Sequence, residues 1–137
     1  MTTDRVQIRL QDPEALGELL GRVRADVAGV AGLVVTSRDG IVVASDLDPG
    51  TPNPGDAADQ SAAMAAASAG IGQRFVQASD HGRLQSVVLE GERGCVGVQP
   101  LSGTLLLVVL GSRDTVMGRF TVAVKQVLNR LLAPTTG

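Results

Sequence analysis

The spacing of apolar side chains predicts a helix near each end of the chain. From Leu16 to Val27 apolar residues recur every three or four positions, which is typical of one face of a helix. Asp12-Pro13-Glu14 supplies a capping acid, a proline at the first helical position and a second acid in the first turn. The same spacing follows Asp114, so we expect Asp114 to cap a closing helix that Pro134 ends.

Five short apolar runs predict strands. Residues 33–37 and 41–45 flank Arg38-Asp39-Gly40, and Asp-Gly between two such runs predicts a hairpin. Residues 84–90, 94–99 and 104–110 are separated by short turns, which predicts two more hairpins. The run at 104–110 is almost wholly apolar and is expected in the middle of the sheet. The run at 84–90 mixes polar and apolar residues, as an edge or interface strand does.

An alanine-rich segment lies between these two groups of strands. Residues 46–56 contain three prolines and two glycines, so we expect an irregular connection there. Residues 57–75 are rich in alanine and predict a helix whose last turns are loosened by Gly70 and Gly72. This helix could be an ordinary cover for the sheet, or its small side chains could allow another polypeptide to approach closely. The whole chain, residues 1–137, is expected to form one α+β domain with an antiparallel sheet.

Composition and charge exclude several classes of function. Hydrophobic residues make up 44% of the chain and aromatic residues only 1%, which argues against sites that depend on aromatic stacking. The net charge of −2 argues against nucleic-acid binding. A single cysteine cannot form an intrachain disulfide. Residues 1–10 lack the apolar core of a signal peptide, and no apolar run is long enough for membrane insertion. We therefore expect a cytoplasmic protein.

The candidate chemical groups do not form a recognisable active site. No phosphate-binding GxxxxGK[ST] loop is present, and Gly70-Ile71-Gly72 follows a helix where a nucleotide-binding loop requires a strand. His81 and Cys95 could form a base–nucleophile couple, but a turn histidine and a core cysteine are the simpler interpretations. One histidine, one cysteine and scattered acids offer no cluster of metal ligands. The sequence thus predicts a non-enzyme with no catalytic residues, cofactor or metal.

Two exposed arginines, Arg38 and Arg74, have the residue type of an arginine finger, the side chain that stabilises phosphoryl transfer in some GTPases. A solvated surface charge is the simpler interpretation of each.

The order and spacing of these features resemble the roadblock/LC7 family, in particular its bacterial MglB-like members. The resemblance covers about residues 13–132. It rests on Gly-Val-x-Gly, an apolar strand, x-Asp-Gly and a second apolar strand ending in Ala-Ser within residues 27–45, followed by the alanine-rich helix, three strands and a final amphipathic helix.

The resemblance implies a five-stranded antiparallel sheet in the order 2-1-5-4-3. The second helix covers one face, and the first and last helices cover the other. It also implies a homodimer in which the third strand and the second helix meet a second copy. The residues predicted at that interface are Ala62, Ala66, Ala69, Gln85, Val87 and Leu89.

Members of this family bind, scaffold or regulate small Ras-like GTPases, or are light chains of larger assemblies. In MglB-like proteins the dimer promotes hydrolysis without supplying an arginine finger. The resemblance therefore implies a regulator of a small GTPase. A structural adaptor and a small-ligand sensor remain as alternatives.

Overall fold

The computed structural model describes residues 12–133, and the predictions made for residues 1–10 and for Pro134 lie outside this range. In chain order the elements are α2 (Pro13–Asp26), β1 (Val30–Ser37), β2 (Val42–Leu47), α3 (Pro54–Ala78), β3 (Val87–Gly91), β4 (Gly94–Pro100), β5 (Leu105–Gly111) and α4 (Met117–Leu132). Every predicted helix and strand is present in the predicted order.

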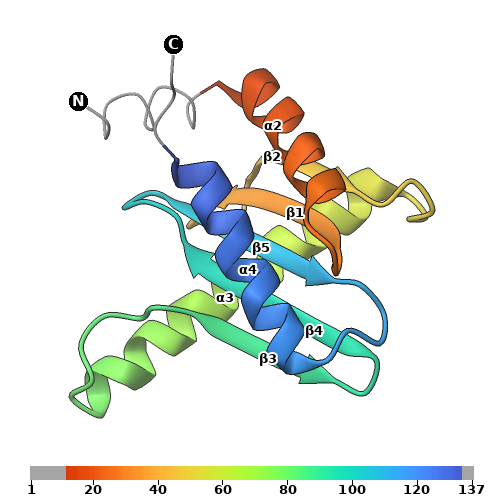
Figure 1. Ribbon diagram of the computed structural model, residues 1–137. Helices are drawn as coiled ribbons and strands as arrows, with labels where there is room; N and C mark the ends of the chain where they lie inside the picture. The colour runs from red at the N-terminus through yellow and green to blue at the C-terminus, as the bar shows by residue number, and fades with distance from the viewer. Residues whose placement is uncertain (1–11, 134–137) are drawn as a thin grey trace.

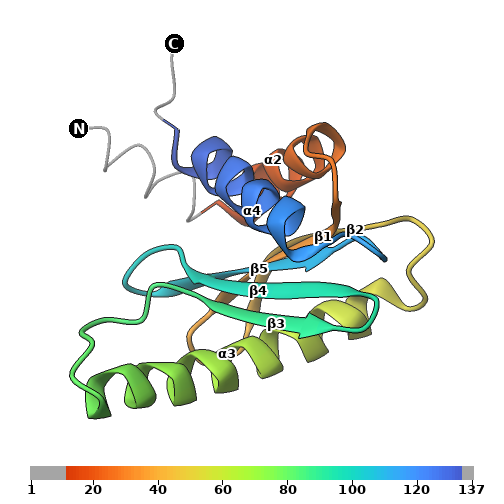
Figure 2. The same cartoon turned by 60° about the horizontal axis from the view of Figure 1, so that its bottom comes forward.

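The sheet has five antiparallel strands in the order β2-β1-β5-β4-β3. Figure 1 shows α2 and α4 on the same side of it, and Figure 2 shows α3 along the opposite side. The implied fold is therefore confirmed, including the central place of β5 and the edge position of β3. Both faces of β5 are covered, because Leu107 and Val109 belong to the cluster under α2 and α4 whereas Leu106 and Val108 belong to the cluster over α3.

Several element boundaries differ from the prediction. β1 begins at Val30 because its first residues pair with Leu110 and Gly111 of β5. α3 continues to Ala78, so Gly70 and Gly72 do not loosen its end as predicted. Gly72 is accommodated because its missing side chain leaves room for Leu84 and Val87, which would lie 3.2–3.3 Å from an added Cβ.

The predicted cap of the last helix is wrong. α4 begins after Val116, which has an extended backbone and makes no side-chain capping hydrogen bond. Asp114 instead lies in the preceding loop with a φ of 67°, and its N–H donates to the carbonyl oxygen of Arg93. Aspartate tolerates this left-handed conformation better than most residues. Asp114 therefore joins the loop before α4 to the β3–β4 turn.

The aromatic ring of Phe120 positions α4 on the sheet. It is fully buried and lies against Gly97 of β4 and Gly111 of β5. A Cβ at Gly111 would lie 2.8 Å from the carbonyl oxygen of Cys95 and 2.9 Å from Cδ1 of Phe120. The two glycines thus leave the space that the largest core side chain occupies.

Alanine has the corresponding role under α3. Its buried residues are Ala58, Ala62, Ala65 and Ala69, which follow one another at helical spacing and face the chain's own sheet. The β1–β2 turn also approaches this helix, since a Cβ at Gly40 would lie 3.3 Å from Cα of Ala63. Gly40 has a φ of 88°, which favours glycine independently of the space available. The small residues of α3 therefore allow it to lie close to the protein's own strands.

We expect Gly111→Ala to lower the free energy of unfolding by about 1–3 kcal/mol, because the added methyl group would clash with backbone as well as with Phe120. Gly17→Ala is the matched control. Gly17 lies in α2 with no atom within 4 Å of an added Cβ, so alanine there should raise stability by about 0.5–1 kcal/mol. Urea unfolding monitored by circular dichroism measures both changes; equal effects would contradict the packing described.

Enlarging an alanine on the sheet-facing side of α3 should also be destabilising. Ala62→Leu is expected to cost about 1–3 kcal/mol, because Ala62 is completely buried. Ala67→Leu, on the exposed side of the same helix, should change stability by less than about 0.5 kcal/mol when compared at equal protein concentration. Thermal unfolding of the two variants tests the assignment of faces, and a larger loss for Ala67→Leu would reverse it.

Candidate protein-interaction surface

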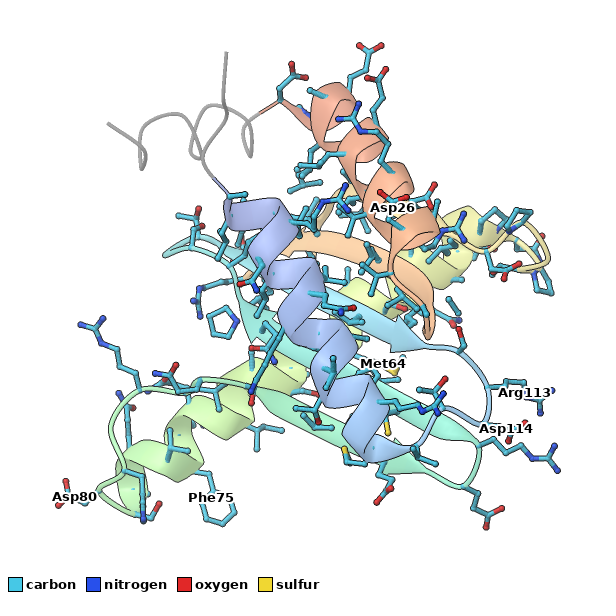
Figure 3. The ribbon with its side chains drawn as sticks, viewed as in Figure 1. Asp26, Met64, Phe75, Asp80, Arg113 and Asp114 are labelled. Carbon is cyan, nitrogen blue, oxygen red and sulfur yellow. The ribbon has the colours of Figure 1, made fainter. Side chains whose placement is uncertain are left out.

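The outer side of α3 carries large apolar side chains that the rest of the described chain does not cover. Met64, Ile71 and Phe75 are 63%, 68% and 72% exposed. They recur at helical spacing and so form a stripe along one flank of the helix. Figure 3 shows Phe75 projecting from the C-terminal part of α3, with Met64 nearer the middle of the molecule. The helix thus has its small residues inside and its bulky apolar residues outside.

This flank of α3 faces β3. Gly72 lies against Leu84 and Val87, whereas Ala63 and Ala66 lie against Gly40 of the β1–β2 turn. At about 100° per residue the stripe falls on the Gly72 side of the helix, nearer β3 than the β1–β2 turn. Leu89 of β3 is 53% exposed. Its partner in β4 is Val96, which packs with the α3 cluster, so Leu89 lies on the α3 face of the sheet.

β3 is an edge strand with one open side. Among residues 12–133 it pairs with β4 alone, so the N–H and C=O groups along its other side have no strand partner. An uncovered edge of this kind can accept another strand. We call the stripe formed by Met64, Ile71 and Phe75, together with Leu89 and the open side of β3, the α3–β3 surface.

The predicted interface residues fall into two groups. Ala62 is 0% and Ala69 5% exposed, because both face the chain's own sheet. Both are therefore covered within one copy of the chain, and their role at an interface remains a prediction. Ala66 is half-buried, Gln85 is exposed, and Val87 and Leu89 are half-buried and exposed members of β3. Gln85, Val87 and Leu89 lie at or beside the α3–β3 surface. Ala66 lies on the other flank of α3, where its Cβ would be 3.5 Å from a Cβ at Gly40 of the β1–β2 turn. The role of these four residues at an interface remains a prediction.

Sequence reasoning missed the stripe of Met64, Ile71 and Phe75. The signal was available, because these larger side chains recur at helical spacing among the alanines. The buried side is the alanine side, since only small residues allow the close approach that the structure shows.

The two candidate arginine fingers have different surroundings. Arg38 donates from Nε to the carbonyl oxygen of Gly103 at 3.0 Å and from Nη2 to that of Ser102 at 3.1 Å. It therefore joins the β1–β2 turn to the β4–β5 turn. Arg74 is exposed on α3 and makes no hydrogen bond or ion pair within residues 12–133.

Arg38 also lines an open hollow of about 330 Å³ at the end of the sheet where β3 begins. Its other lining residues are Gln73, Arg83, Leu84, Gln85, Pro100, Leu101, Ser102 and Gly103. Gln73 fixes one wall, because its Oε1 accepts a hydrogen bond from the backbone N–H of Leu84 at 3.0 Å. The hollow contains two arginines and no acidic residue.

The candidate catalytic couple is not assembled. His81 is exposed in the turn before β3, whereas Cys95 is buried among the residues under α2 and α4 and pairs with Glu90 near the end of β3. No group of three or more histidine, cysteine or acidic side chains within residues 12–133 could hold a metal ion. In the same part of the chain, no helix combines the length and hydropathy needed to cross a membrane.

Comparison with known proteins identifies the same family from the sequence and from the fold. A model of the roadblock/LC7 domain matches residues 16–111. An uncharacterized protein of Methanocaldococcus jannaschii is 30% identical over 105 residues, which cover 77% of this chain and 87% of that protein.

Solved structures show the same arrangement. The gliding protein MglB of Thermus thermophilus has a TM-score of 0.69 with 23% identity, covering 84% of each chain. A structure of MglB with a tetrameric arrangement matches this chain with a TM-score of 0.72 and is also 23% identical in sequence. The match covers 88% of each chain. The family match covers all five strands of the sheet and all of α3. The chain belongs to the roadblock/LC7 family of protein-interaction domains.

Proposed function

We propose that this chain works as a homodimer that binds and regulates a small Ras-like GTPase without catalytic groups of its own. The observation that carries the proposal is the α3–β3 surface, where an apolar helical stripe adjoins an open strand edge. A contiguous apolar patch on a folded domain commonly marks a site for another protein. A second copy that adds its β3 to this edge would pair the open backbone groups and cover the stripe at once.

A twofold dimer fits this surface particularly well. In a twofold contact the same patch is used by both copies, so an apolar stripe meets an identical apolar stripe. The antiparallel pairing of two identical β3 strands would extend one sheet across both subunits. Gln85, Val87 and Leu89 would then lie at or near the contact, together with Met64, Ile71 and Phe75.

The family supports the choice of a GTPase as the client. Its MglB-like members, which this chain resembles in sequence pattern and in fold, act on small Ras-like GTPases. The exposed Arg74 is close to the proposed dimer contact, and Arg38 is held by backbone carbonyls. Neither is assigned a catalytic role, which agrees with regulation through contact with the GTPase.

Replacing Ile71 by aspartate should dissociate the dimer, because a charge would be buried against the second stripe. Val122→Asp is the matched control, since Val122 is 55% exposed on α4, away from the α3–β3 surface. Sedimentation equilibrium should give about twice the 14.0 kDa chain mass for the parent and the control, and about 14.0 kDa for Ile71→Asp. A parent protein that sediments as a monomer would contradict the dimer.

The client is tested with a small GTPase encoded beside this chain in its genome. We expect the dimer to bind the GTP-loaded form, measured by calorimetry, and to change its rate of GTP hydrolysis. Binding without any change in rate would favour a structural adaptor. Absence of binding in both nucleotide states would contradict the proposed client while leaving the dimer unaffected.

A further inference from the structure

Opposite charges flank the two ends of β3. Arg83 precedes the strand, whereas Glu90 lies near its end and Glu92 lies in the turn beyond it. All three side chains are exposed, and none of them makes a hydrogen bond or ion pair within residues 12–133. Arg93 next to Glu92 and Asp80 before Arg83 are exposed as well. The edge therefore carries a net charge of −1 at its end from Glu90, Glu92 and Arg93, and its beginning is positive through Arg83 together with Arg38.

The positive end is reinforced by a second arginine. Arg83 lines the hollow that Arg38 also lines, and no acidic side chain contributes to that hollow. Arg38 is held in place by the carbonyl oxygens of Ser102 and Gly103, so its charge cannot move away from the site. Two guanidinium groups beside one hollow repel each other, and a carboxylate placed next to Arg83 would relieve this repulsion.

The proposed dimer brings such a carboxylate to this end. Two identical strands that meet across a twofold axis run in opposite directions, so the end of one lies beside the beginning of the other. Arg83 lies four residues before β3, so with the axis near Val87 the side chains of Glu90 and Glu92 of a second copy would approach Arg83 of the first. The same contact would occur once more on the other side of the axis. The charge pattern along β3 is thus complementary to itself in the antiparallel direction.

We propose that Arg83 of each copy pairs with Glu90 or Glu92 of the other, and that these ion pairs make β3 select a second copy of this chain as its partner. The inference rests on the proposed homodimer and adds its recognition element. Exposed ion pairs contribute little affinity, so the apolar stripe supplies most of the binding. Charge complementarity acts on specificity, because a chain with the wrong charges at these positions would place like charges together.

Charge reversal on two separate copies tests the inference. Arg83→Glu makes both ends of β3 negative, and the double variant Glu90→Arg, Glu92→Arg makes both ends positive. Each variant alone should dimerise at least about tenfold more weakly than the parent, because like charges meet on both sides of the axis. An equimolar mixture should recover the parent's affinity, since every contact then joins opposite charges. Arg22→Glu, on α2, is the control and should leave dimerisation unchanged.

The measurement is the dissociation constant from sedimentation velocity at low and at high salt, with circular dichroism to verify that each variant is folded. At low salt the mixture should dimerise more tightly than either variant alone, and high salt should reduce this difference, because it screens attraction and repulsion alike. This result supports the inference. A parent dimer whose affinity is unaffected by Arg83→Glu overturns the ion pairs but not the dimer. A variant that dimerises normally yet no longer binds the GTPase also overturns them, and assigns Arg83 to the client. A monomeric parent overturns both proposals.

Discussion

The close contact between α3 and the sheet determines how the two sides of this helix are used. Ala58, Ala62, Ala65 and Ala69 allow the helix to approach the strands, but each buries little more than a methyl group. A buried methylene-sized group contributes about 0.8 kcal/mol, whereas a buried leucine or phenylalanine contributes about 1.5–3 kcal/mol. The helix is therefore held by many small contributions, while its large apolar side chains remain on the outside. The opposite face of the sheet is packed with leucine, valine and Phe120 instead.

This unequal packing connects folding with assembly. A second chain that covers Met64, Ile71 and Phe75 would bury more apolar surface on α3 than the alanines do within one copy. Because such a partner binds the folded chain and not the unfolded one, it raises apparent stability as its concentration rises. Regulation of a GTPase would then depend on a surface that exists in full only after two copies have met.

Most of the fold could be predicted from the sequence, because hydrophobic spacing and the Asp39-Gly40 turn are local signals. The strand order needed the family resemblance, since spacing does not say which strands are neighbours. Asp114 was misassigned because its capping pattern depends on local sequence, whereas its actual conformation depends on a distant hydrogen bond to Arg93. The exposed stripe of α3 was missed for a similar reason. The alanine content shows that another element can pack closely against the helix, but it does not show on which side of the helix this element lies. The ion pair of Arg24 with Asp46, which connects α2 to β2, is equally invisible to local patterns.

The second edge strand of the sheet, β2, bears on how far a sheet shared between copies of the chain could extend. β2 is the other edge strand, and its pairing with β1 is interrupted by a bulge between Val35 and Thr36. It ends at Leu47, one residue after the ion-paired Asp46, and leads into a loop containing Pro49 and Pro52. Irregular pairing, charge and proline all discourage the addition of a further strand. If copies meet only through β3, the shared sheet would close at two subunits, because β2 does not favour the addition of a further strand.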